Sequence, residues 1–396
     1  YKLFFQMILM MENKKPKKVY LAGSFDFMHH GHINLIQKAK QFGDLTIAVT
    51  TDKTVMSYKR LPLLSYEERK KVLENIQGVK EVVPHEPLDY VPNLLKYKPD
   101  YVIHGDDLRK SKPKVYARII ETLAAWGGEF IEVPYTKGVS STKIRKLLHE
   151  TGKNNSSQRR KRLKRFMSAT NLTRFCAAKS QRTAVAIEES FIPKENIKKE
   201  FDGIWLKSNS KNNISFNESD TNKTADLNLI HSVIKSTTKP IVVELDSSKI
   251  EHISLQSQIL STMGVSGICL NDSDHERLRQ TIALSKHATR DDSFSNFVGI
   301  QLNDDSNHQT ILQKINDYIM SGADGVVINS KVSDKEKIRN FATEFQKQEF
   351  TVPMLLNCNE SQNFSETEIK ELGAKVIVHP ASSKENILQQ LQATFN

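Results

Sequence analysis

The residues best suited to chemistry stand at 23–32, where the chain reads Gly-Ser-Phe-Asp-Phe-Met-His-His-Gly-His directly after an apolar run. We expect a strand to end in this turn and an amphipathic helix to follow over 31–42. His29 and His32 then lie beside the free backbone N–H groups of a helix N-terminus, which can bind anionic oxygens such as those of phosphate. A lone histidine would more often be a surface residue, but the whole string in a strand–turn–helix setting is far more specific.

Basic residues downstream complete a site that can carry out nucleotidyl transfer. An acceptor oxygen attacks the α-phosphorus of a nucleoside triphosphate and pyrophosphate leaves, so the protein must align the reactants and neutralise the moving charge. Lys59, Arg60 and Arg69 can hold the acceptor and the β- and γ-phosphates; a solvent-exposed loop and helix face is the alternative. The phosphate-binding candidates in the first turn are Gly23, Ser24, Phe25, Asp26 and Gly31.

Two later loops supply further candidates for the same site. Residues 137–145 read Lys-Gly-Val-Ser-Ser-Thr-Lys-Ile-Arg, a second phosphate site at a helix start, although a routine N-cap is the plain alternative. Its candidate residues are Gly138, Ser140, Ser141 and Thr142. The other loop contributes Gly105, Asp106 and Asp107, whose carboxylates can bind the base, the acceptor or Mg²⁺, or simply form a turn.

The elements that must position these loops alternate between strand and helix over residues 17–150. This alternation predicts an α/β fold with a doubly wound, Rossmann-like parallel sheet, whose ligand lies beyond the carboxyl ends of the strands. Ser65, with Glu68 three residues later, predicts a capping box at the start of one helix. The expected strands are 19–22, 45–49, 81–83, 101–104 and 130–133.

The bulk composition points to two domains, because 396 residues exceed one ordinary core. The net charge of +11 is concentrated near 13–18, 59–71 and 159–165, which suits nucleic acid, an anionic membrane surface or a phosphate-rich substrate. The three cysteines lack metal-ligand spacing and fit a reducing compartment. No segment reaches 18 apolar residues, so we expect a cytoplasmic protein. Residues 1–16 are expected to be a tail, partly foreign to a native chain that starts at Met11.

The second half of the chain repeats the alternation over 163–396. Eight candidate strands, the first at 183–188 and the last at 374–379, predict a (β/α)8 barrel. Residues 151–162 are expected to be a polar, basic linker. Six of the seven residues over 159–165 are basic, which fits a nuclear signal, an RNA-binding patch or, as we favour, a solvated first turn of a helix.

Residues 17–150 resemble the glycerol-3-phosphate and phosphoethanolamine/phosphocholine cytidylyltransferases, because they carry the motifs GxFDxxHxGH, HGDD and GxSST. The resemblance implies CTP and Mg²⁺, with His29 and His32 as catalytic residues and phosphate binding by basic residues near Lys59 and Arg60 and by the turn at 138–142. We predict that Lys59 and Arg60 also belong to the catalytic residues. One departure is that the last family motif, usually Arg-Thr-Glu-Gly, begins here with Tyr-Thr-Lys. The loss of that arginine changes the expected acceptor or nucleotide contact.

The whole chain from about residue 17 resembles phosphoenolpyruvate mutases that carry an N-terminal cytidylyltransferase-like domain and open phosphonate biosynthesis. The resemblance rests on 88–107, Trp126–Glu129, Phe201–Trp205 and several barrel segments, and it implies a barrel of the phosphoenolpyruvate mutase/isocitrate lyase type. Both families tend to associate, so a homo-oligomer is expected.

The residues expected to work in that barrel are largely replaced. The Asp-x-Asp-Thr-Gly metal loop reads Glu-Leu-Asp-Ser-Ser over 244–248, Glu-Asp-Lys reads Asn-Asp-Ser over 271–273, the substrate arginine aligns with Leu302, and His-Ser reads Asn329-Ser330. Trp205, Asp246 and Asp272 survive. The lost arginine and lysine would neutralise the negative charge of a trianionic substrate. We therefore expect a degenerate, non-catalytic barrel with an oligomerisation or regulatory role.

Three functional interpretations follow. The leading one is a cytidylyltransferase that moves CMP from CTP to phosphoethanolamine, phosphocholine, glycerol-3-phosphate, 2-aminoethylphosphonate or a similar monoester. The second is a bifunctional enzyme whose barrel also makes phosphonopyruvate from phosphoenolpyruvate. The third is a basic protein that binds RNA or an anionic surface, and it is the weakest because the basic run has no interleaved aromatic residue and no recognition motif.

Overall fold

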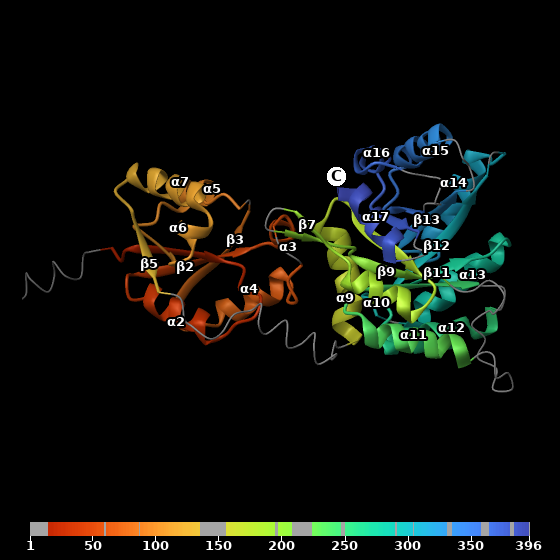
Figure 1. The fold of residues 1–396 in the computed structure, drawn as a ribbon, viewed down its shortest axis with the longest axis horizontal. Coiled ribbons are helices and arrows are strands. Elements are labelled where there is room, and N and C mark those ends of the chain that lie inside the picture. The colour runs from red at the N-terminus through yellow and green to blue at the C-terminus, as the bar shows by residue number, and fades with distance from the viewer. Residues whose placement is uncertain are drawn as a thin grey trace, which may run out of the picture. The chain divides into compact units, whose positions relative to one another are not determined.

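The computed structural model divides the chain into two compact units, Tyr1–Leu147 and Leu148–Asn396 (Figure 1). It describes residues 15–58, 61–86, 88–134, 156–194, 197–207, 224–246, 250–289, 291–303, 305–330, 335–357, 364–380 and 384–395. Most of the expected tail therefore lies outside the described residues. Within these ranges, no helix is long and apolar enough to cross a membrane.

The N-terminal unit is built on a five-stranded parallel sheet in the order β3-β2-β1-β4-β5, which confirms the predicted Rossmann-like fold. Its described elements are β1 (Lys18–Gly23), α2 (His30–Ala39), β2 (Asp44–Thr50), α3 (Asp52–Met56), α4 (Tyr66–Glu74), β3 (Val79–His85), α5 (Val91–Tyr97), β4 (Tyr101–Gly105), α6 (Leu108–Ser111), α7 (Pro113–Ala124) and β5 (Glu129–Val133).

The central strand β1 is buried on both faces, as its unbroken apolar sequence requires. Val19 and Leu21 face a core that includes residues of α2 and α4, whereas Tyr20 and Ala22 face a core with residues of α5, α6 and α7. Figure 1 shows these helices on opposite faces of the sheet. Because Ile36 is fully buried in the first core, α2 is anchored and its N-terminus is fixed beside the end of β1.

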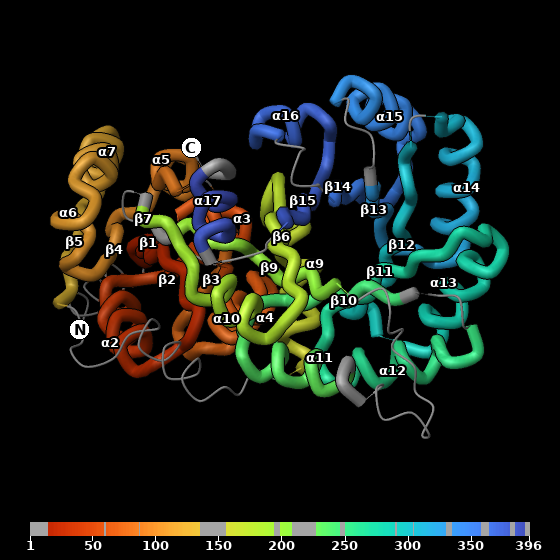
Figure 2. The backbone as a smooth tube through the Cα atoms, turned by 45° about the vertical axis from the view of Figure 1, so that its right-hand side comes forward, coloured from red at the N-terminus to blue at the C-terminus, as the bar shows by residue number. Residues whose placement is uncertain are grey.

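The C-terminal unit is a closed barrel of eight parallel strands in the order β10-β11-β12-β13-β14-β15-β6-β9, which confirms the predicted barrel (Figure 2). Its elements are α9 (Ser156–Ala169), β6 (Thr173–Ala178), α10 (Gln181–Glu189), β7 (Ile192–Lys194), β8 (Ile197–Lys199), β9 (Gly203–Leu206), α11 (Thr224–Ser236), β10 (Ile241–Asp246), the short 3₁₀ helix η1 (Ile250–His252), α12 (Ile253–Met263), β11 (Gly267–Asn271), α13 (His275–Thr289), β12 (Ser295–Leu302), α14 (His308–Met320), β13 (Gly325–Ser330), α15 (Lys335–Lys347), β14 (Met354–Asn357), α16 (Glu366–Glu371), β15 (Val376–His379) and α17 (Lys384–Phe395). Strands β7 and β8 form a separate antiparallel pair.

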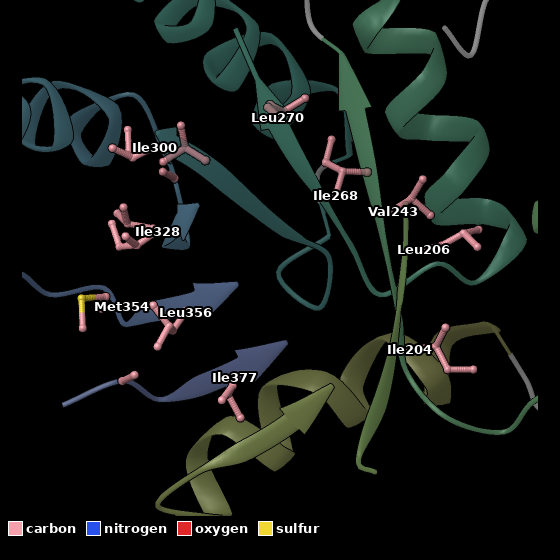
Figure 3. Packing of buried hydrophobic residues seen from close by; sticks show 14 of the residues in the cluster. Ile204, Leu206, Val243, Ile268, Leu270, Ile300, Ile328, Met354, Leu356 and Ile377 are labelled. Carbon is pink, nitrogen blue, oxygen red and sulfur yellow. The ribbon is translucent and has the colours of Figure 1, made fainter. Parts of the chain in front are cut away.

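Alternate residues of the barrel strands form two apolar layers. The outer layer packs between strands and helices and includes Ile204, Val243 and Ile268, which Figure 3 shows among the buried side chains of this cluster. The inner layer fills the barrel, where the Trp205 ring lies 6.1 Å from the Phe175 ring and 6.2 Å from the Phe297 ring. The interior of the barrel at the level of these rings is therefore a packed core, as is usual for this architecture.

The first barrel strand was wrongly predicted at 183–188. That segment belongs to α10, and the first strand is β6 at 173–178. Ala184 and Ile187 stand three residues apart and are both buried, which is the spacing of one helix face. A short apolar run of this kind fits a strand or a helix equally well.

The predicted linker over 151–162 is also wrong from residue 156 onward, where α9 begins. Arg159 in this helix is 3% exposed, and its Nη2 donates to the carbonyl oxygens of Ile234 and Thr237 at 2.9 and 2.8 Å. Arg160 donates to the carbonyl of Ser261 and to Asp291. These carbonyls lie at the ends of α11 and α12, where helices leave acceptors unsatisfied. Arg159 and Arg160 of the basic run therefore bind α9 to the ends of α11 and α12 and do not belong to a solvated helix turn.

Candidate active site

The turn after β1 leaves the N-terminus of α2 without a side-chain cap. His29 occupies the N-cap position in an extended conformation, and its side chain makes no capping hydrogen bond. Its carbonyl accepts from the backbone N–H groups of His32 and Ile33 at 2.9 and 3.2 Å, which starts the helix. Uncapped N–H groups at a helix start are suited to an anionic ligand.

The two histidines of the motif are stacked against each other. Their ring centroids lie 3.8 Å apart with an interplanar angle of 21°. Burial lowers the pKa of His32 to about 4, with a further contribution from His29, and burial followed by the charge of His30 lowers the pKa of His29. Both imidazoles are therefore neutral at pH 7 in the free protein, and each keeps one N–H donor.

The same histidines carry two buried polar atoms that lack a partner. Among the described residues, Nδ1 of His29 and Nδ1 of His32 are buried without any hydrogen bond. Buried polar atoms in folded proteins are nearly always paired, and exceptions often mark a functional site.

A cavity of about 490 Å³ opens beside this pair, a size that suits a small-molecule ligand. It lies at the carboxyl ends of β1 and β4, where the strand order of the sheet reverses direction. Ligands of doubly wound sheets bind at this switch point. The lining residues are Ala22, Gly23, Ser24, Phe25, His29, Gly31, His32, Asn34, Leu35, Gln37, Lys38, His104, Gly105, Asp107, Val133 and Pro134.

The structure brings most described candidates of the first turn and of the 105–107 loop to this cavity. It also adds residues that the sequence analysis missed. Asn34 and Lys38 stand three and seven residues after Gly31, so they share one face of α2, and that periodicity could have revealed them. His104 precedes Gly105 in the HGDD motif, and its Nδ1 lies 3.6 Å from Oδ1 of Asp107.

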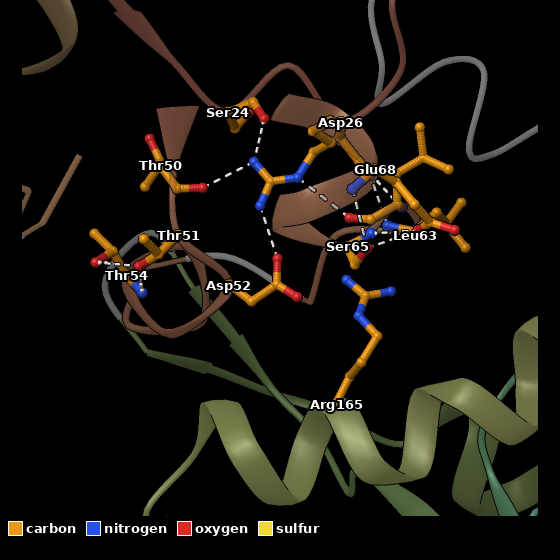
Figure 4. A network of polar contacts seen from close by, with 12 residues as sticks. Ser24, Asp26, Thr50, Thr51, Asp52, Thr54, Leu63, Ser65, Glu68 and Arg165 are labelled. Carbon is orange, nitrogen blue, oxygen red and sulfur yellow. Dashed lines mark hydrogen bonds and ion pairs between the residues drawn. The ribbon is translucent and has the colours of Figure 1, made fainter. Parts of the chain in front are cut away.

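Arg69 does not line the cavity, so its predicted phosphate contact is corrected. The residue is 1% exposed, and its guanidinium makes four hydrogen bonds to backbone and side-chain oxygens. Figure 4 shows three of the residues that supply these oxygens, Ser24, Thr50 and Asp52. The guanidinium donates to the carbonyls of Ser24 (2.5 Å), Thr50 (2.8 Å) and Leu64 (3.2 Å) and to Oδ1 of Asp52 (2.7 Å). Arg69 thus ties the turn after β1 to the end of β2 and to the start of α4.

Asp26 and Asp106 are likewise absent from the cavity lining. Asp26 is 5% exposed, and its Oδ1 accepts from the backbone N–H groups of Leu63 and Leu64 at 2.7 and 3.2 Å. It therefore fixes the loop before α4 to the turn after β1. The N–H of Asp106 donates to the carbonyl of Val133, which braces the neighbouring loop.

Six of the predicted residues lie outside the described residues, so their roles rest on the sequence alone. They are Lys59, Arg60, Gly138, Ser140, Ser141 and Thr142.

Two of the three surviving residues of the barrel, Trp205 and Asp272, make hydrogen bonds within the protein. The Trp205 indole N–H donates to Oε1 of Glu244 at 2.6 Å. Both oxygens of Asp272 accept from Arg277, at 2.5 Å each, and its side chain is 2% exposed. The side chain of Asp246 lies outside the described part of the chain, and Leu302 belongs to the outer apolar layer. Within the described ranges, no group of three His, Cys, Asp or Glu could hold a metal ion.

Comparison with known proteins matches each unit to a family. The phosphoenolpyruvate phosphomutase model covers residues 163–396, more than half of the chain. The chain belongs to this family. A second model, cytidylyltransferase-like, covers residues 20–147. Glycerol-3-phosphate cytidylyltransferase of Bacillus subtilis (strain 168) is 33% identical over 140 residues, which are 33% of this chain and 95% of that protein. This phosphomutase-family chain therefore also contains a domain of the cytidylyltransferase-like family.

Other relatives match only in part. Ethanolamine-phosphate cytidylyltransferase of Arabidopsis thaliana is 33% identical over 142 residues, so the chain spans 32% of that relative and uses 34% of its own length. Among solved structures, phosphonopyruvate hydrolase with oxalate and Mg²⁺ is 15% identical with a TM-score of 0.47, over 59% of this chain and 84% of that one. The structure of 2,3-dimethylmalate lyase is 13% identical with a TM-score of 0.44, and the match covers 60% of this chain and 84% of that one.

Proposed function

We propose that the N-terminal unit transfers CMP from CTP to a small phosphate or phosphonate monoester and releases pyrophosphate. The observation that carries this proposal is the stacked pair of His29 and His32, whose Nδ1 atoms are buried, beside an uncapped helix N-terminus in a cavity at the sheet's switch point. The similarity to ethanolamine-phosphate and glycerol-3-phosphate cytidylyltransferases supports the choice of CTP and of a phosphomonoester acceptor.

The reaction forms a bond between an acceptor oxygen and the α-phosphorus and breaks the bond from that phosphorus to the pyrophosphate oxygen. In our proposal His29 and His32 donate hydrogen bonds to the α- and bridging oxygens, where charge increases in the transition state. The N–H groups of α2 add a fixed positive potential. Lys38, together with Lys59 and Arg60, balances the remaining phosphate charge.

Mg²⁺ is part of the same proposal, as a cation that arrives with the triphosphate. Mg²⁺ commonly uses substrate phosphates, waters and one or two carboxylates rather than a cage of protein ligands. Asp107 is the carboxylate that lines the cavity, and no complete metal cage exists among the described residues, so the site fits this mode of binding. When bound, the ion would neutralise phosphate charge.

We propose further that the barrel does not isomerise phosphoenolpyruvate. Asp272 is bound to Arg277, Glu244 accepts from Trp205, and Leu302 replaces the expected arginine, so the described residues do not fit a metal-bound trianion. The RNA-binding alternative loses support, because Arg159 and Arg160 bind backbone carbonyls of the barrel itself.

The test is to incubate the full chain with CTP and Mg²⁺ and each of four acceptors, and to follow pyrophosphate release. The acceptors are phosphoethanolamine, phosphocholine, glycerol-3-phosphate and 2-aminoethylphosphonate. We expect turnover with at least one, and none when CTP is omitted. A folded protein that turns over none of them would contradict the proposal. A phosphonate resonance in ³¹P NMR from phosphoenolpyruvate and Mg²⁺ would restore the bifunctional alternative.

A further inference from the structure

The mouth of the barrel carries a ring of polar side chains that the proposed function does not use. Strand alternation places Glu244, Asn271, Asn329 and Asn357 two residues beyond inner-layer positions, in the carboxyl-terminal halves of β10, β11, β13 and β14. Lys207 occupies the same position directly after β9. Barrel proteins bind small molecules at this end.

The carboxamides of this ring approach one another closely. Nδ2 of Asn357 donates to Oδ1 of Asn329 at 2.7 Å. The neighbouring strand β12 carries Gly299, where a Cβ would lie 1.8 Å from Oδ1 of Asn271 and 3.0 Å from Nδ2 of Asn329. Gly299 therefore leaves the space in which amides from β11 and β13 meet.

Two opposite charges stand in the same ring without neutralising each other. Glu244 accepts from the Trp205 indole, and Nζ of Lys207 reaches Oδ1 of Asn357 only at 3.5 Å. Both charges act on the buried Cys269 thiol: burial is the largest cause of its raised pKa, Glu244 raises it further and Lys207 lowers it. Within the described part of the chain, each of the two charges has a neutral partner only. Half-buried charges are costly until paired.

This arrangement favours a ligand with charges of both signs. A trianion would find one ammonium group and face the carboxylate of Glu244. A molecule with one ammonium and one oxyanion group would pair with Glu244 and Lys207 together, and the carboxamides would donate to its oxygens. We infer that the barrel mouth binds such a small zwitterion, with its ammonium on Glu244 and its oxyanion on Lys207, Asn329 and Asn357.

The inference is tested by isothermal titration of the full chain with 2-aminoethylphosphonate and with β-alanine, which distinguish a phosphonate from a carboxylate oxyanion. Phosphoenolpyruvate with Mg²⁺ and ethanolamine serve as comparison ligands. We expect at least one zwitterion to bind and both comparison ligands to bind more weakly. Binding of neither zwitterion, or preferred binding of phosphoenolpyruvate, would overturn the inference.

Variants then locate the binding. Glu244→Gln keeps an acceptor for Trp205 but removes the charge, and Lys207→Met removes the ammonium; each should weaken binding at least tenfold. The matched controls Glu251→Gln and Lys235→Met change exposed residues of the same unit and should have no effect. Zwitterion binding that survives both mouth variants would contradict the assignment.

Discussion

At the scale of single residues, the N-terminal site depends on side chains that hold the backbone rather than a ligand. Phe25 has a left-handed backbone with φ of 48°, which is strained for a residue with a side chain. Its ring lies 5.3 Å from the His32 ring and packs against Gly23. Arg69 and Asp26 tie the same turn to neighbouring loops. The turn is thus held in place before any ligand arrives.

Arg69→Met is expected to destabilise the N-terminal unit. The change leaves the Asp52 carboxylate and three carbonyls without their donor, and breaking a buried ion pair typically costs about 3–5 kcal/mol. Urea denaturation measures the loss. Lys71→Met, at an exposed position of the same helix, should change the free energy of unfolding by less than about 0.5 kcal/mol. Equal effects of the two variants would contradict a structural role for Arg69.

The sequence predicted the cavity-lining histidines better than the residues that hold the turn in place. His29 and His32 belong to a motif whose spacing is specific in its context. Arg69 carries no such information, because a basic residue after a capping box can face solvent, a phosphate or the protein interior. Only the contacts with Ser24 and Thr50, which lie far away in the sequence, decide between these roles.

At the scale of elements, the start of α4 was predictable and the first barrel strand was not. The Ser65–Glu68 capping box forms as expected, with Ser65 N–H donating to Oε2 of Glu68 at 2.8 Å. Segment 183–188 was misassigned because Thr, Val and Ile favour strands locally, whereas burial of one face against the barrel favours the helix α10. The cap Ser180 was the overlooked signal, since its side chain accepts from Thr183 N–H.

Ser180→Ala tests the helical assignment of this segment. Loss of the cap should lower the free energy of unfolding by about 1 kcal/mol, and Ser180→Asp should restore most of it because aspartate also caps helices. Thermal or urea unfolding measures both variants. If alanine has no effect, or aspartate fails to rescue, the N-terminus of α10 does not depend on this cap.

At the scale of the whole molecule, three histidines whose pKa is lowered by the fold make stability depend on pH. Burial lowers the pKa of His32, His85 and His379 to about 4 each, from an ordinary value of 6.5. Between these values the unfolded chain binds protons that the folded chain does not. Stability should therefore be fully present above pH 6.5 and should fall as the pH drops toward 4.

Urea unfolding between pH 7.5 and 5 measures this dependence. His85→Gln should flatten the curve in its window, because one proton-binding group is removed from the unfolded state. His287→Gln, at an exposed position, serves as the matched control and should leave the slope as it is. An unfolding free energy that stays constant from pH 6.5 to 5 would contradict the burial of these imidazoles.

The two-unit organisation and both fold types could be predicted from the sequence, since strand–helix alternation and the family motifs extend over nearly the whole chain. The barrel mouth could not be. Its ring joins Lys207, Asn329 and Asn357, which are far apart in the sequence and meet only when the barrel closes. Each substitution relative to the family pattern, taken alone, indicates the loss of a catalytic residue in the barrel. Only the position of these residues next to one another suggests that the barrel mouth binds a different ligand.

The central claim is that the stacked histidine pair catalyses nucleotidyl transfer, and one measurement tests it most directly. It compares single-turnover pyrophosphate release, with CTP, Mg²⁺ and an active acceptor, for His32→Ala and His30→Ala. His30 is exposed and absent from the cavity lining, so its variant should react at nearly the unmodified rate. His32→Ala should be slower by at least about 100-fold. Folded His32→Ala protein that releases pyrophosphate at the unmodified rate would contradict the account.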